Sequence, residues 1–329
     1  MGTGKEMQGL DDAVRAAAEE VARNPDDELA RERLLESLSR YPDASGDPRR
    51  VEQIRWLLER NPRHRAFRTY GSIDANILPA DFRELKDRWL ELVAAAPADE
   101  EIIEGAIAFL APQRLAEAWN IARAATQQQP GNPALWFLLG RIGLDREEAY
   151  LAFERALKLG HQHPSLITWL GKAAFDAGND ERAAECGRDL LRQAEEESRA
   201  SSAVSDWPEQ GDAFWRRAAR EGLDRTTTRD LATARSDHAF HKHHGHTLLG
   251  LVACRQGRVD DAAQHLLASA DLTPDYRLSA YGPSLRLIRA LLNVGEWECG
   301  LDFLRAWKGM WDDSRIDEWI ASVERFQSP

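Results

Sequence analysis

Cysteine and long apolar runs are both scarce in this sequence. The three cysteines, Cys186, Cys254 and Cys299, are far apart and show no Cys-x-x-Cys spacing, so neither a disulfide framework nor a zinc ribbon is expected. No apolar run reaches the roughly 18 residues of a membrane span, and the first residues lack the apolar core of a signal peptide. These absences predict a cytoplasmic protein that neither crosses a membrane nor is secreted.

An excess of basic residues and the usual catalytic motifs are also missing. The chain has 43 basic and 55 acidic residues and a formal net charge of -12, which disfavours nucleic acid and anionic lipid as partners. Its one cluster of basic and aromatic residues, at 63–70, is short. No nucleophile with a local base, phosphate loop or nucleotide fingerprint is present. We therefore expect a binding protein rather than an enzyme, with no organic cofactor.

What the sequence does contain is helical periodicity. Ala, Leu, Glu and Arg dominate, apolar positions recur every three or four residues, and Pro and Gly interrupt the pattern at short intervals. The pattern predicts helices throughout and no strand. In the N-terminal region we expect helices near residues 8–23, 27–40, 48–60 and 80–95.

A Leu-Gly pair recurs within similar stretches of the chain. The segment 136–140 reads WFLLG and is followed by AYLAF at 149–153, and further pairs lie at 170–171 and 249–250. The unit that begins at His246 has the spacing of a full repeat of about 34 residues. Degenerate copies cover 102–130 and 287–307. Gly or Ala at fixed places lets paired helices approach closely, so these units predict stacked helix hairpins.

This pattern resembles the tetratricopeptide repeat family, whose units read W-x2-L-G-x2-Y, then A-x3-F and a terminal proline. The resemblance covers residues 99–197 and 243–314, and the C-terminal part is also similar to bacterial tetratricopeptide proteins without an assigned activity. It implies an all-α fold, a right-handed superhelical array of antiparallel helix hairpins (a TPR-like α-solenoid). We expect a helical N-terminal region at 1–97, compatible with degenerate repeats, then repeats at 98–197, an inserted loop and short helix at 198–242, and repeats with a capping helix at 243–329.

The resemblance also implies a concave face lined by the first helix of each hairpin. Such a mixed basic and apolar face suits a protein or peptide with acidic groups, because arginine binds carboxylates in a bidentate way. The expected function is therefore that of an adaptor or scaffold with a partly basic groove. The alternative is that these cations are solvated or paired with nearby acidic residues. The expected binding residues are Phe137, Arg141, Lys172, Phe175, His244, Thr247, Arg255 and Arg289.

Four of the nine histidines lie within six positions, between His241 and His246. His241 and His244 share one face of a helix, and an i, i+3 pair is able to hold a transition metal if further ligands join it. A metal-binding protein or metal-dependent enzyme is thus the alternative function, with His238, His241, His244 and His246 as candidate ligands. The competing interpretations are packing, since His246 aligns with Trp136, and a pH-sensitive patch.

Tryptophan is frequent near the C-terminus. Trp297, Trp307, Trp311 and Trp319 are among eleven tryptophans in the chain, and they lie where a solenoid ends. An apolar end of this kind is capped or used for self-association. A homodimer through this end is a further expectation.

Overall fold

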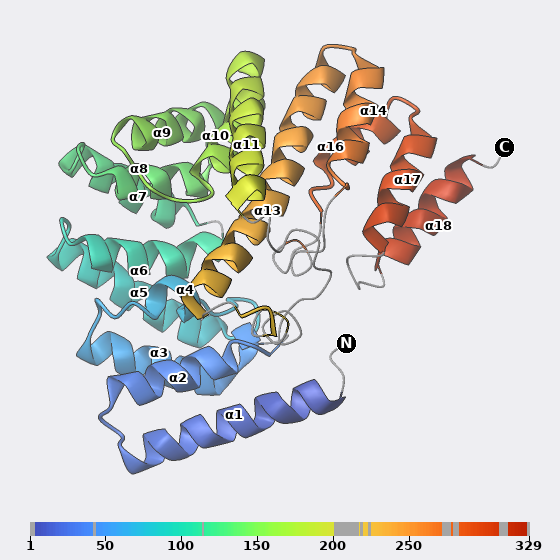
Figure 1. Cartoon of the computed structure of the whole chain (residues 1–329). Helices are drawn as coiled ribbons and strands as arrows, with labels where there is room; N and C mark the ends of the chain where they lie inside the picture. The colour runs from blue at the N-terminus through green and yellow to red at the C-terminus, as the bar shows by residue number, and fades with distance from the viewer. Residues whose placement is uncertain are drawn as a thin grey trace. The chain divides into compact units, whose positions relative to one another are not determined.

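The computed structural model describes residues 4–41, 44–113, 115–200, 217, 220–222, 225–271, 278, 283–308 and 315–327. Over these ranges the regular elements are α-helices and short 3-10 turns, with no strand (Figure 1). The chain divides into two compact units, Met1–His161 and Gln162–Pro329. None of the described helices combines the length and the apolar character needed to cross a bilayer.

Unit 1 consists of helices that pack against their neighbours in the chain. Among these pairs are α1 with α2, α6 with α7 and α8 with α9. The expected N-terminal helices are confirmed as α1, α2, α3 and α5, and α4 is an addition. The elements are α1 (Gly4–Arg23), α2 (Glu28–Leu38), η1 (Ala44–Gly46), α3 (Pro48–Arg60), α4 (Phe67–Tyr70), α5 (Pro79–Ala95), α6 (Glu100–Leu110), η2 (Ala111–Gln113), α7 (Ala116–Gln128), α8 (Pro133–Ile142) and α9 (Arg146–Lys158).

Regularly spaced prolines mark the turns between successive hairpins of unit 1. Prolines 25, 62, 97 and 130 recur at intervals of 37, 35 and 33 residues. Equivalent turns are joined by hydrogen bonds: Asn61 Nδ2 donates to Glu28 Oε2 over 2.9 Å, and Asn132 Nδ2 donates to Glu100 Oε2 over 2.7 Å. The repeat of about 34 residues therefore extends into the N-terminal region.

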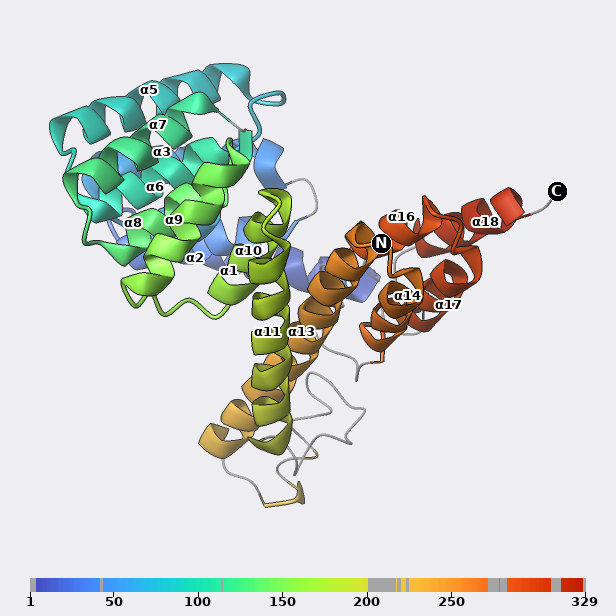
Figure 2. The ribbon, with the colours of Figure 1, turned by 90° about the horizontal axis from the view of Figure 1, so that it is seen from above.

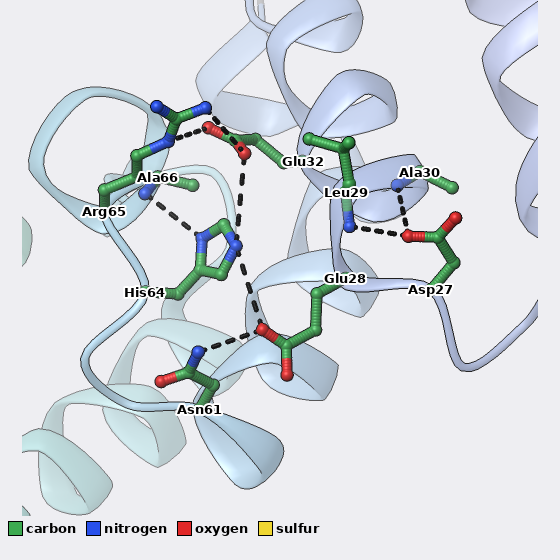
Figure 3. A network of polar contacts seen from close by, with 9 residues as sticks. All are labelled: Asp27, Glu28, Leu29, Ala30, Glu32, Asn61, His64, Arg65 and Ala66. Carbon is green, nitrogen blue, oxygen red and sulfur yellow. Dashed lines mark hydrogen bonds and ion pairs between the residues drawn. The ribbon is translucent and has the colours of Figure 1, made fainter.

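Figure 3 shows one of these turns, where the chain before α4 meets the start of α2. Asp27 caps α2 by accepting hydrogen bonds from the backbone N–H groups of Leu29 and Ala30. Arg65 Nε donates to Glu32 Oε1 over 3.0 Å, and the ring of His64 lies between Glu28 and Glu32. The basic residues of the cluster at 63–70 are thus engaged within unit 1, since the guanidinium groups of Arg63 and Arg68 also pair with carboxylates.

Unit 2 is a second set of hairpins. α10 packs against α11, α13 against α14, and α16 against α17. α11 and α13 run side by side in both views (Figures 1 and 2). The helices are α10 (Leu166–Asp176), α11 (Asp180–Ala200), α13 (Arg225–Arg255), α14 (Val259–Ala268), α16 (Arg286–Leu292), α17 (Trp297–Lys308) and α18 (Arg315–Gln327). The described residues are thus a TPR-like array of helix hairpins, as expected.

The glycines of the Leu-Gly pairs are places of close approach between helices. A Cβ atom added at Gly140 would lie 2.8 Å from the ring of Phe153 on α9, and one at Gly171 would lie 2.5 Å from Leu248 on α13. Such distances leave no room for a side chain. Gly178 and Gly257 instead end α10 and α13 with φ of 84° and 74°, a conformation that favours glycine.

For the segment 198–242 we expected an inserted loop and a short helix; both ends of this segment are helical, and most of the residues between them lie outside the described ranges. α11 continues to Ala200, and α13 begins at Arg225, so residues 225–242 belong to the same helix as the repeat stretch that follows. The sequence from 225 to 244 contains neither Pro nor Gly, so nothing in it ends a helix. Trp207, Phe214 and Trp215, the aromatic residues of the middle of this segment, lie outside the described residues.

The C-terminal tryptophans are not equivalent. Trp307 on α17 is 1% exposed and packs against Phe303 and the ring of His243, with centroid distances of 6.1 and 5.3 Å. Trp319 on α18 is half-buried, and Trp311 lies outside the described residues. Trp307 is therefore a core residue of unit 2, and self-association through this end stays a prediction.

Candidate functional site

One side of α10, together with residues of α13 and the start of α16, carries most of the expected binding residues of unit 2. On α10 this side consists of Thr168 and of Lys172, Phe175 and Asp176, which lie four, seven and eight positions later and so share one side of the helix. α13 contributes residues at a similar spacing, and α16 contributes its first residue. We call this set the helix-A face; it consists of Thr168, Lys172, Phe175, Asp176, His244, Thr247, Arg255 and Arg286.

Arg255 is held firmly on this face. The Cζ atom of its guanidinium lies 3.5 Å from the centre of the Phe175 ring, a cation–π contact. Its Nη1 atom donates to Asp180 Oδ1 over 2.6 Å and to the backbone carbonyl of Phe175 over 3.0 Å. Phe175 and Arg255, which the sequence predicted as separate binding residues, are therefore in direct contact with each other.

Arg286 reaches from α16 to α10. Its guanidinium pairs with the carboxylate of Asp176, with Nη1 3.2 Å from Oδ2, and its Cζ lies 5.4 Å from the centre of the Phe175 ring. α13 contacts both of these helices. The ion pair therefore links the first helix of the first hairpin of unit 2, α10, to that of the third, α16, and places a second guanidinium beside Phe175.

Lys172 differs from these two arginines. It is half-buried, its Nζ lies 5.5 Å from the centre of the Trp169 ring, and within the described residues it makes neither an ion pair nor a hydrogen bond. Burial and the nearby charge of Arg286 lower the pKa of Lys172 to about 8, against a smaller opposing effect of Asp176. Its ammonium group is thus charged at neutral pH, but no carboxylate of the described residues pairs with this charge.

Two buried polar atoms near Lys172 also lack partners. Within the part of the chain that the structure describes, neither Thr168 Oγ1 nor His244 Nδ1 has a hydrogen-bond partner, and these residues are 2% and 9% exposed. The His244 ring packs edge-on against Phe240 at a centroid distance of 4.4 Å. Burial and the charge of Lys172 lower the pKa of His244 well below its ordinary value, so this imidazole is neutral.

The other candidate metal ligands point to separate partners. His238 Nδ1 is 2.7 Å from the carbonyl of Ala194, and His241 Nδ1 is 2.9 Å from Glu197 Oε2. His246 Nδ1 lies 3.0 Å from Nδ1 of His265 on α14. In the part of the chain that the structure describes, no three His, Cys, Asp or Glu side chains come together in a group able to hold a metal ion.

His243, which we did not select from the sequence, has a hydrogen-bond partner at each ring nitrogen. Its Nδ1 is 2.9 Å from the carbonyl of Ser269, and the backbone N–H of Ser284 donates to its Nε2 over 2.9 Å. Burial lowers its pKa to about 4, with a smaller contribution from Lys172. This imidazole is a neutral structural link between α13 and the segments at 269 and 284.

The remaining expected binding residues lie elsewhere or are already engaged. Phe137 and Arg141 belong to unit 1, where Phe137 is buried against Phe153 and Arg141 is exposed. Thr247 is buried and donates a hydrogen bond to the carbonyl of His243, and Arg289 is exposed on α16. Sequence reasoning missed Arg286, although its position three residues before Arg289 places both on one side of a helix.

Comparisons with known proteins add little to this description. No family model and no curated protein matches the chain. Among solved structures, the APC/C hetero-tetramer Cut9-Hcn1 matches at 14% identity over 95% of this chain, with a TM-score of 0.40, and yeast Tom70 at 12% over 97%, with a TM-score of 0.35. The chain spans 52% and 60% of those chains. The P58(IPK) TPR domain matches at 12% identity, over 99% of this chain and 98% of that one, with a TM-score of 0.21.

The poorly compensated Lys172 leads to a stability prediction. Replacing Lys172 by Met removes a partly desolvated charge while keeping a flexible side chain of similar size, so we expect the free energy of unfolding at pH 7 to rise by about 1–2 kcal/mol. The pKa of Lys172 is lowered in the folded protein, so the wild type should gain stability as the pH rises from about 8 to about 10.5. The variant should lack this gain.

Urea unfolding at pH 7 and at pH 10 measures both effects. The control is Lys158→Met, since Lys158 is exposed on α9 and its replacement should change stability by less than about 0.5 kcal/mol. A Lys172→Met protein that is less stable than the wild type at pH 7 would show that the ammonium group has a favourable partner in the folded state.

Proposed function

We propose that the protein is a binding scaffold whose helix-A face in unit 2 holds an acidic segment of a partner protein. The observation that carries this proposal is the charge of the face. Its cations are Lys172, Arg255 and Arg286, and the carboxylates paired with them are Asp176 and Asp180. The face thus keeps a positive charge within a chain of net charge -12.

The apolar groups on and beside this face favour a peptide over a small ion as the ligand. The guanidinium groups of Arg255 and Arg286 lie over the Phe175 ring. Trp169, on the same helix as Phe175, is 39% exposed. Aromatic rings supply contact area, and arginines orient carboxylates. A polyanion such as nucleic acid fits less well, because most of the positive charge is already paired and the whole chain would repel it.

A library of random twelve-residue peptides displayed on phage tests the proposal. We expect the wild type to select peptides that combine Asp or Glu with aromatic or aliphatic residues. Arg286→Gln leaves Asp176 unpaired and should weaken binding of the selected peptides about tenfold or more, because a charge-assisted hydrogen bond is lost and a carboxylate is exposed to the ligand. Binding should also weaken as salt rises.

The matched control is Arg188→Gln, which makes the same change of charge at an exposed position of α11. It should bind the selected peptides like the wild type. Circular dichroism and the thermal unfolding midpoint show whether Arg286→Gln is still folded. Selected peptides without acidic residues, or equal affinities of Arg286→Gln and Arg188→Gln, would contradict the proposed function.

A further inference from the structure

Two of the three cations of the helix-A face form ion pairs, and the third, Lys172, does not do so within the described ranges. Arg255 is paired with Asp180 and Arg286 with Asp176. Lys172 has no carboxylate within ion-pair distance over the described ranges, although Asp176 lies near enough to influence its pKa. Charges removed from water are normally paired in proteins. The face therefore has one more positive than negative charge, and the charge that is not neutralised is that of Lys172.

The surroundings of Lys172 offer further hydrogen bonds that the protein does not use. Thr168 lies one turn before Lys172 on the same side of α10, and its Oγ1 is buried with no partner among the described residues. On α13, His244 Nδ1 is likewise without a partner, and Lys172 is the charge that most lowers the pKa of His244. Buried polar groups are rarely left unsatisfied. Two polar atoms able to form further hydrogen bonds, one on α10 and one on α13, therefore lie near the unpaired charge of Lys172.

We propose that Lys172, Thr168 and His244 form a subsite for a single carboxylate of the bound segment. This inference rests on the proposed function and names the group that the partner must present. A carboxylate carries one negative charge, which matches the one cation left unpaired, and its two oxygens accept several hydrogen bonds. A phosphate dianion would bring a second charge with no cation to balance it.

The first test needs no peptide. Acetate is the probe for a carboxylate and inorganic phosphate the probe for a dianion, each added to the full chain at constant ionic strength against sodium chloride. A ligand that binds the folded state raises the thermal midpoint by mass action. Acetate should raise the midpoint of the wild type and not that of Lys172→Met, and phosphate should do so less than acetate. No difference between wild type and variant with acetate would overturn the inference.

The second test uses the selected peptides. Each Asp or Glu of a peptide is replaced in turn by Asn or Gln, and the affinity is measured with the wild type and with Lys172→Met. For one carboxylate, the amide should bind the wild type about tenfold more weakly, while Lys172→Met binds both forms equally. Thr168→Val should reduce the same discrimination about threefold and affect no other position.

The pH dependence of peptide affinity gives a readout that a purely structural role would not produce. The titratable or charged groups around Lys172 are Asp176 on α10, His243 and His244 on α13, and Arg286 on α16. The histidines are already neutral and Arg286 stays charged, so between pH 7 and 9.5 Lys172 is the group that changes. The affinity of the wild type should fall over this range, and that of Lys172→Met should stay flat.

The outcomes separate this inference from the proposed function. If Lys172→Met discriminates every acid from its amide as the wild type does, the carboxylate subsite is refuted, while a weak Arg286→Gln variant still supports binding on this face. If Arg286→Gln and Lys172→Met both bind like the wild type, the proposed function fails too.

Discussion

Gly105→Ala is expected to destabilise unit 1 by about 2–3 kcal/mol, although alanine is ordinarily the better helix former by about 1 kcal/mol. A Cβ atom at this position of α6 would lie 2.5 Å from Cη2 and 3.1 Å from Cζ3 of Trp89 on α5. The Trp89 side chain is fully buried and packs edge-on against Phe67 at a centroid distance of 5.1 Å. Because the indole is rigid and fully buried, relief of this contact requires α5 and α6 to move apart.

Urea unfolding of Gly105→Ala measures the cost, and Gly131→Ala is the matched control. A Cβ at Gly131 meets no atom within 4 Å, so this variant should be nearly neutral. The double variant Gly105→Ala/Trp89→Leu should show favourable coupling, because the smaller side chain makes room for the methyl group. Equal stabilities of the two alanine variants would mean that α5 and α6 are less tightly packed at Gly105 than the structure shows.

The helix hairpins were predictable because their determinants are local. Prolines in the connecting turns and the small residues of the Leu-Gly pairs act within about 34 residues of chain, and the close contact between Gly140 and Phe153 confirms the pairing they indicated. The start of α13 at Arg225 was missed, because the repeat pattern marks where a hairpin packs and not how far its helix continues beyond the contact.

The helix-A face was predictable in part. Helical spacing alone groups Lys172 with Phe175 and His244 with Thr247 and Arg255. In the structure Arg255 contacts Phe175, and Lys172 lies near enough to His244 to lower its pKa. Spacing does not reveal which cations are neutralised. Arg255 and Arg286 pair with carboxylates that lie 75 and 110 residues away in the sequence. Only the tertiary structure shows that Lys172, unlike them, pairs with no carboxylate of the described ranges.

The histidine cluster likewise shows that spacing in the sequence does not predict the tertiary partners of a side chain. On a helix each residue is rotated by about 100° from the previous one, so neighbouring histidines face different surroundings. His241, His243 and His246 accordingly approach Glu197, Ser269 and His265. A dense group of histidines in sequence is therefore dispersed among several contacts, and the pH response of the cluster depends on burial rather than on proximity.

Acidification from pH 6.5 to pH 4 is expected to destabilise unit 2 strongly. His243 Nδ1 donates to the carbonyl of Ser269, and its Nε2 accepts from the N–H of Ser284, an arrangement that only the neutral ring supports. Protonation would turn Nε2 into a donor that faces another donor. His246 and His265 present the same problem, because their Nδ1 atoms are 3.0 Å apart and at most one of them can donate.

The direction of the effect follows from the pKa values. Burial lowers the pKa of both His243 and His246 to about 4, against about 6.5 in the unfolded chain. Between these values the unfolded state binds more protons, so stability is full above pH 6.5 and is lost as the pH falls toward 4. For the fully buried His243 the limiting loss is about 3 kcal/mol, and His246, which is partly exposed, adds less.

Hydrogen exchange of the full chain at pH 7.5, 6 and 5, corrected for the intrinsic rates, locates the loss. Protection of α13 and α14 should fall steeply, and that of α2, α3 and α5 should change little, because carboxylates such as Asp47 and Glu84 have lowered pKa values and titrate below this range. His243→Gln keeps a donor and an acceptor but cannot be protonated. It should be less stable at pH 7.5 and lose less stability on acidification; an undiminished loss would show that another group in unit 2 takes up the proton.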